Sequence, residues 1–233
     1  MASHTSPHAS GLGVISAVAF DMDGLMFDTE SVYWKSADEL LRRRGRRYTE
    51  EARDAIMGRP PEYCMKYFIR TYGLSDDWRD LRRESEELNL FFLRQGYATT
   101  PGLFELLDEL DRLGLPRCVC TGSARYFVEE ALRKDGLRAR FDFLLTSDDV
   151  ERGKPFPDIY LEAARRFGVA ASDTLVLEDS AAGCESARSA GATCCMLRAS
   201  HNTRVDFSRA DLVVERLDEP QLITRLRARA DRA

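Results

Sequence analysis

The sequence predicts an α/β protein with a doubly wound parallel sheet and an all-helical unit inserted after the first strand. Two observations support this fold class. From residue 97 onward, short apolar runs of strand length alternate with helical patterns, as right-handed crossovers between parallel strands require. Residues 28–96, in contrast, have helical periodicity and no strand pattern. We therefore expect a disordered tail at 1–10, a core of 11–27 and 97–233, and a helical domain at 28–96.

Composition agrees with a large domain carrying a smaller insertion. The chain has 233 residues, of which 44% are hydrophobic and 31% charged, and its formal net charge is -5. This balance favours neither nucleic acid nor an anionic membrane. The sequence contains no apolar run of about 20 residues and no signal-peptide pattern at its start, so we expect a cytoplasmic protein. The six cysteines have neither zinc spacing nor a disulfide framework, which favours thiols in the core.

The first strand is predicted from the apolar run between Val14 and Phe20, which suits a strand covered on both faces. Gly24 then allows a sharp turn. In the inserted unit, apolar stripes and stop signals predict four helices, at about 32–44, 49–57, 61–72 and 75–95.

The remaining elements alternate between helix and strand. We expect helices at 103–113, 126–134, 158–167, 181–190 and 220–229, and strands at 115–120, 141–146, 174–177, 193–197 and 212–214.

Two acids follow the first strand directly. Asp21 and Asp23 lie two residues apart, so they point the same way if the chain stays extended. Like charges held this close repel unless a cation or a proton intervenes, which suggests a metal site or general acid/base chemistry. A solvated Asp/Gly turn is the simpler alternative.

Polar residues also follow three other predicted strands. These are Thr121-Gly122-Ser123, Lys154 before Pro155, and Glu178-Asp179. Taken singly, Thr-Gly-Ser is more typical of a helix cap and a lone lysine is usually solvated. The amides of Gly122 and Ser123 near a helix start could nevertheless bind an anion. Carboxyl ends of parallel strands converge on one crevice, and this combination suits phosphoryl transfer with an aspartate nucleophile.

In order and spacing, these residues resemble the four signature motifs of the haloacid dehalogenase superfamily. The resemblance covers residues 17–197, and its motifs are Asp21-Met22-Asp23-Gly24 with Asp28-Thr29, then Thr121, Lys154-Pro155 and Glu178-Asp179-Ser180 with Gly183. The inserted unit resembles the cap of subfamily I, and the sheet would be Rossmann-like. Within the superfamily, the chain is most similar to the group of β-phosphoglucomutase, 2-deoxyglucose-6-phosphate phosphatase and pseudouridine-5′-phosphatase.

The resemblance implies a role for each motif residue. Asp21 would be the nucleophile and Asp23 the general acid and base, while Thr121 and Lys154 would hold the phosphoryl oxygens. Mg²⁺ would be bound by the Asp21 carboxylate, the Asp23 carbonyl and Asp179, with Glu178 a ligand directly or through water. Such hard oxygen ligands suit Mg²⁺.

The favoured function is a Mg²⁺-dependent phosphatase for a small phosphorylated metabolite, such as a sugar or nucleoside phosphate, acting as a monomer or weak dimer. A phosphomutase is the alternative. However, β-phosphoglucomutase has a histidine where this chain has Tyr33, and Pro61 lies where its cap arginine is expected. Asp23 argues against a dehalogenase, whereas a phosphonatase would need Lys35 or Lys66 as a Schiff-base lysine.

A catalytically inactive binding protein is expected to have lost a motif acid, and none is lost. In the cap loop, Arg59 is a candidate substrate contact, with a solvated surface arginine as the alternative.

Overall fold

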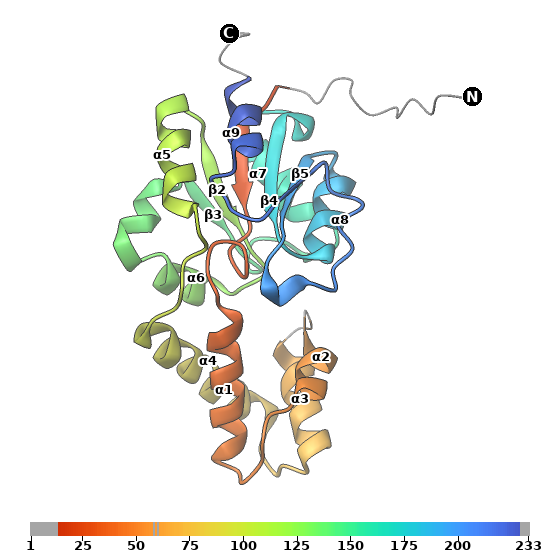
Figure 1. Ribbon diagram of the computed structural model, residues 1–233. Helices are drawn as coiled ribbons and strands as arrows, with labels where there is room; N and C mark the ends of the chain where they lie inside the picture. The colour runs from red at the N-terminus through yellow and green to blue at the C-terminus, as the bar shows by residue number, and fades with distance from the viewer. Residues whose placement is uncertain (1–13, 58, 60, 229–233) are drawn as a thin grey trace, which may run out of the picture.

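The computed structural model describes residues 14–57, 59 and 61–228, which form a sheet-containing core and a helical unit beside it (Figure 1). The predicted tail of residues 1–10 lies outside the described residues. None of the described helices is long and apolar enough to cross a membrane.

The core contains a parallel sheet with the strand order β3-β2-β1-β4-β5-β6. The chain starts in the middle of the sheet, builds outward to β3, and then returns to the other side of β1. The fold class predicted from the sequence, a doubly wound parallel sheet, is therefore confirmed. The strands are β1 (Ala17–Phe20), β2 (Arg117–Cys120), β3 (Phe143–Leu145), β4 (Thr174–Glu178), β5 (Thr193–Leu197) and β6 (Leu212–Val214).

Helices cover both faces of the sheet because β1 is apolar on both sides. Val18 and Phe20 belong to the apolar cluster under α5 (Leu103–Leu113), α6 (Arg125–Ala131) and α9 (Pro220–Arg227). Ala19 belongs to the cluster under α7 (Asp158–Phe167) and α8 (Ala181–Ala190). The described part of the core also contains short 3-10 helices, namely η1 (Lys134–Arg140), η2 (Ala171–Asp173) and η3 (Ser200–Asn202).

The described residues of the inserted unit form helices joined by turns and loops, without a strand. Its helices are α1 (Glu30–Arg42), α2 (Glu50–Ile56), α3 (Pro61–Tyr72) and α4 (Trp78–Gln95). They enclose an apolar cluster of their own, which includes Leu40, Phe68 and Leu81. Thr49 caps α2, since its side chain accepts a hydrogen bond from the Ala52 amide. A separate apolar core permits this unit to hold its shape independently of the sheet.

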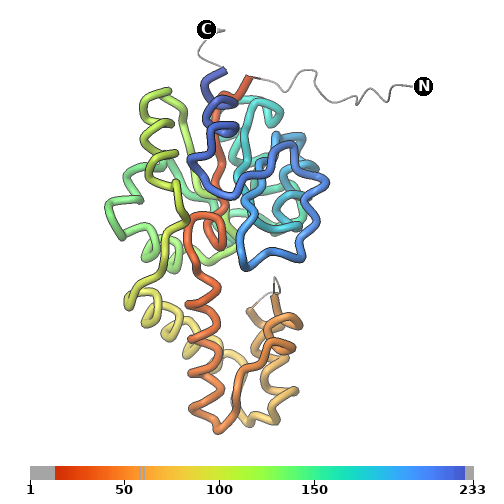
Figure 2. Tube along the Cα trace, viewed as in Figure 1, coloured from red at the N-terminus to blue at the C-terminus, as the bar shows by residue number. Residues whose placement is uncertain are grey.

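The two chain segments that join the units run side by side (Figure 2). The Asp28 amide donates to the Ala98 carbonyl at 2.9 Å, and the Thr100 amide donates to the Met26 carbonyl at 3.0 Å. Gly24 and Gly96 have φ values of 80° and 117°, which favour glycine over residues with a Cβ.

Several predicted element boundaries are wrong. The first strand begins at Ala17 rather than near Val14, whose side chain is exposed instead of covered by a helix. The helix predicted at 126–134 ends at Ala131, and the chain cannot continue it because Asp135 and Gly136, inside η1, adopt positive φ values of 53° and 68°. The following strand is correspondingly shorter than the predicted 141–146. None of these differences moves the strand ends that carry the motif residues.

Candidate active site

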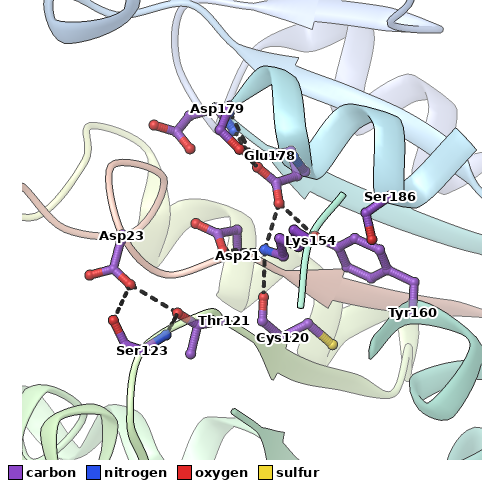
Figure 3. Close-up of polar contacts among 12 residues, drawn as sticks. Asp21, Asp23, Cys120, Thr121, Ser123, Lys154, Tyr160, Glu178, Asp179 and Ser186 are labelled. Carbon is purple, nitrogen blue, oxygen red and sulfur yellow. Dashed lines mark hydrogen bonds and ion pairs between the residues drawn. The ribbon is translucent and has the colours of Figure 1, made fainter. Parts of the chain in front are cut away.

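The motif residues from three neighbouring strands meet at the carboxyl edge of the sheet (Figure 3). Asp21 follows β1, Thr121 follows β2, and Asp179 follows β4. Both β2 and β4 pair directly with β1, with Phe20 opposite Val119 and Leu177. The strand register therefore brings residues about 100 and 160 positions apart in the chain to one point.

Lys154 lies at the centre of this group. Its Nζ is 2.5 Å from Asp21 Oδ1, 2.6 Å from Glu178 Oε1 and 3.0 Å from the Cys120 carbonyl oxygen. Burial disfavours the charged lysine, but the carboxylates of Asp21 and Glu178 outweigh burial and raise the pKa of Lys154 above its usual value. The side chain is thus a fixed ammonium group beside Asp21.

Glu178 is fully buried, and both of its carboxylate oxygens accept hydrogen bonds. Oε1 accepts from Lys154 and from the Tyr160 hydroxyl at 2.6 Å. Oε2 accepts from the Asp179 amide at 3.1 Å and from the Ser180 amide and hydroxyl at 3.2 and 3.0 Å. Burial alone would raise the pKa of Glu178, but Lys154 and these donors lower it. Glu178 therefore holds Lys154 in position as an anion.

Gly183 in the first turn of α8 makes room for Glu178. A Cβ at this position would lie 1.8 Å from Glu178 Oε1, which is far inside van der Waals contact. This glycine is therefore required by the close approach of α8 to the carboxylate. Gly183 belongs to one of the sequence motifs, and this contact explains why a glycine is needed there.

Three carboxylates are placed so that they could hold a metal ion. Asp21, Glu178 and Asp179 each offer one oxygen, and these oxygens all lie within 4.8 Å of one another. Burial raises the pKa of Asp21 well above its usual value, even though Lys154 acts in the opposite direction. Ionising all three carboxylates would need more positive charge than the one ammonium supplies, so a divalent cation with a preference for oxygen fits this group.

Asp23 is held by hydroxyl groups. Thr29 Oγ1 donates to Asp23 Oδ1 at 2.7 Å, while Thr121 Oγ1 and Ser123 Oγ donate to Oδ2 at 2.9 and 2.7 Å. The Ser123 amide, a predicted anion donor, donates to Thr121 Oγ1 at 3.1 Å. In this state, Thr121 and Ser123 therefore orient Asp23.

Tyr33 connects α1 of the helical unit to the hydroxyls that hold Asp23. Its OH lies 2.9 Å from Ser123 Oγ, and its ring stacks on Phe127 of α6 with a centroid distance of 5.1 Å. Because Ser123 gives its own proton to Asp23, Tyr33 must donate in this pair. The sequence had singled out Tyr33 only by comparison with a mutase, and did not predict its contact with Ser123.

His201 in η3 contacts Asp179, and the sequence did not predict it as a site residue. Its Nε2 lies 2.7 Å from Asp179 Oδ2, and this hydrogen bond raises the pKa of the imidazole. A Cβ on Gly24 would lie 2.1 Å from the same Asp179 oxygen. Nothing in the local sequence around His201 indicated a site, because the contact depends on how the chain returns after β5.

Two predicted ligand-binding residues lie at the edge of this arrangement. Gly122 is exposed between Thr121 and Ser123. Arg59 is exposed between α2 and α3, and its guanidinium carbon is 5.4 Å from the ring centroid of Tyr63. The ends of α2 and α3 that flank Arg59 face the core (Figure 1). Its neighbours 58 and 60 lie outside the described residues.

Comparisons with known proteins show the family of the chain. Residues 18–197 match the family described as haloacid dehalogenase-like hydrolase. A Drosophila melanogaster protein named "Probable pseudouridine-5′-phosphatase" is 34% identical over 220 residues, which cover 88% of this chain and 95% of the relative. A phosphorylated carbohydrates phosphatase of Thermotoga maritima is 30% identical over 177 residues, covering 76% and 82%.

Among solved structures, a mutant of CbbY from Rhodobacter sphaeroides in complex with xylulose-1,5-bisphosphate superimposes with a TM-score of 0.78. It is 27% identical, and the match covers 88% of this chain and 96% of that one.

Proposed function

The chain belongs to the haloacid dehalogenase-like hydrolases and is a phosphoric monoester hydrolase, and on this premise we propose that it hydrolyses a small phosphorylated metabolite through an aspartyl-phosphate on Asp21. The observation that supports this most directly is the position of Lys154. It places a buried ammonium 2.5 Å from the Asp21 carboxylate, at the strand edge where the other motif acids gather. An ammonium in this position can neutralise the oxygens of an incoming phosphoryl group.

The proposed reaction has two displacements at phosphorus. The Asp21 carboxylate forms a bond to phosphorus, the bond to the leaving alkoxide breaks, and Asp23 gives its proton to that oxygen. A water molecule then gives a proton to Asp23 as its oxygen attacks the phosphorus of the acyl phosphate. The bond to Asp21 breaks, which releases inorganic phosphate and restores the carboxylate.

For these steps, Asp23 has to exchange its present hydrogen bonds. Its carboxylate accepts from Thr29, Thr121 and Ser123, so proton transfer requires it to turn from at least one of these hydroxyls to the leaving oxygen. Thr121 would then be free to donate to a phosphoryl oxygen. A positioned general acid typically raises the reaction rate by about 10²–10⁴-fold.

We propose Mg²⁺ as the cation, held by Asp21, Asp179 and the Asp23 carbonyl. When bound, this ion would supply positive charge to the phosphoryl oxygens. Glu178 belongs to the same acidic group, but its oxygens already accept hydrogen bonds from Lys154, Tyr160 and Ser180. We therefore assign Glu178 mainly to holding Lys154, with any contact to the ion made through water.

The proposed substrates are sugar and nucleoside phosphates, the classes that the names of the similar proteins suggest. Arg59 would contact the part of the substrate away from the phosphate. Its stacking on Tyr63 orients the guanidinium at the end of the helical unit that faces the core. This unit would act as a cap that closes over the site and excludes water.

The test is a phosphate-release screen over sugar, nucleoside and glycolytic phosphomonoesters, with Mg²⁺ and with excess chelator. We expect Mg²⁺-dependent release from a subset of these esters and no release by Asp21→Asn. Activity retained by Asp21→Asn would contradict the covalent mechanism. Phosphorus NMR with β-glucose 1-phosphate distinguishes the mutase, since glucose 6-phosphate as the main product would contradict a phosphatase.

A further inference from the structure

The loop after β5 contacts Asp179 at two separate points. Besides the contact between His201 and the carboxylate, Asn202 Nδ2 donates to the Asp179 carbonyl oxygen at 2.8 Å. The same nitrogen donates to the Leu197 carbonyl at 2.8 Å, and Asn202 Oδ1 accepts from the Ala199 amide at 2.9 Å. Asn202 is buried, so it fixes the loop to the end of β5 and to the backbone of Asp179.

His201 contacts one of the two carboxylate oxygens of Asp179. Oδ2 lies 2.7 Å from the imidazole Nε2, and it is so close to the Gly24 backbone that a Cβ there would lie 2.1 Å from it. Among the described residues, Oδ1 accepts no side-chain or backbone hydrogen bond. A carboxylate fixed through one oxygen presents the other in a defined direction. Since Asp179 belongs to the acidic group with Asp21, that direction bears on cation binding.

We propose that His201 is a positioning residue for the cation site, which orients the Asp179 carboxylate through Oδ2. This inference rests on the proposed function only in taking Asp179 as a ligand of Mg²⁺. The ring nitrogens of His201 do not belong to the group of possible ligand atoms that lie within 4.8 Å of one another. His201 therefore contacts the ligand Asp179 rather than the ion. Residues that hydrogen-bond to a metal ligand in this way typically contribute about 10–100-fold to metal affinity.

The position of His201 makes it suitable for substitution. About 25% of its side-chain surface is exposed, and it lies in a short 3-10 helix. The Asn202 contacts hold the loop without any help from the imidazole. Loss of the imidazole should therefore leave the loop in place and free only the Asp179 side chain.

The test measures Mg²⁺ binding in the absence of substrate. Mg²⁺ is titrated calorimetrically into metal-free native protein, His201→Leu, His201→Gln and the control Ser200→Ala, all at the same pH. We expect His201→Leu to bind Mg²⁺ about 10–100-fold more weakly. Glutamine carries an amide nitrogen at nearly the position of Nε2, so His201→Gln should recover most of the affinity. Ser200 is exposed in the same loop, and its variant should bind like the native protein.

A second loss variant, His201→Asn, keeps the inference testable if His201→Leu does not fold, because asparagine is too short to reach Oδ2. Native affinity in either loss variant would overturn the positioning role while leaving the proposed phosphatase intact. Failure of His201→Gln to recover affinity would also overturn it. Absence of Mg²⁺ binding by the native protein would refute the proposed metal and this inference together, so the two failures are distinguishable.

Discussion

Replacing Lys154 with methionine should strongly destabilise the core, because it leaves two buried carboxylates without their cation. Lys154 Nζ lies 2.5 Å from Asp21 and 2.6 Å from Glu178, and the exposed fractions of the three side chains are 11%, 8% and 0%. Removing one partner of a buried ion pair typically costs about 3–5 kcal/mol. Methionine has nearly the length of lysine, so the loss should reflect charge rather than a cavity.

The deficit should depend on pH in a defined direction. In the native protein, burial acts to raise the pKa of Glu178, but Lys154 and other donors lower it. The Glu178 carboxylate therefore contributes stability above its unfolded pKa of about 4.3 and loses it as the pH falls through its folded pKa. In Lys154→Met, burial should instead raise the pKa of Glu178. Folding of this variant then binds a proton at Glu178, so its stability falls as the pH rises.

We therefore expect the stability difference between native protein and Lys154→Met to be larger at pH 7 than at pH 5. It is measured by urea unfolding with excess chelator, so that no cation replaces the ammonium. The double variant Lys154→Met/Glu178→Gln should be less destabilised than the sum of the single variants, because the uncompensated charge is gone. A deficit under about 1 kcal/mol at pH 7, or one that grows on acidification, would refute this reasoning.

Three further predictions concern other contacts of the site. Asp23→Asn should lower kcat by about 10²–10⁴-fold for a sugar phosphate and less for p-nitrophenyl phosphate, whose leaving group needs no acid; equal losses would argue against proton transfer. Arg59→Ala should raise KM for the best substrate about tenfold, and by a smaller factor for p-nitrophenyl phosphate, as initial rates would reveal. Gly183→Ala should lower the free energy of unfolding by about 1–3 kcal/mol or more, as measured by thermal unfolding, because its Cβ would meet Glu178. A Cβ on the control Gly153 would have no atom within 4 Å, so Gly153→Ala should be near neutral.

The sequence by itself determined where the chemical groups lie along the fold. Apolar runs that end in Asp21, Thr121 and Glu178 predict buried strands whose polar residues follow directly. The carboxyl ends of parallel strands share one edge, so these residues had to converge whatever the details of helix packing. Even the misplaced start of β1 had no effect on the site, because the site depends on where the strand ends.

Only the tertiary structure decided which groups support the motif residues. Tyr160 lies on α7, His201 in η3 and Tyr33 on α1, and each contacts a residue at least 18 positions away in the chain. Their positions along the sequence resemble ordinary helix or loop residues, since hydroxyl and imidazole groups have no local pattern that identifies a distant partner. These contacts arise from the packing of α7 and α8 against the sheet, the return of the chain after β5 and the placement of the helical unit. Side-chain partners across such interfaces are set by three-dimensional packing, which is not encoded in hydrophobic periodicity.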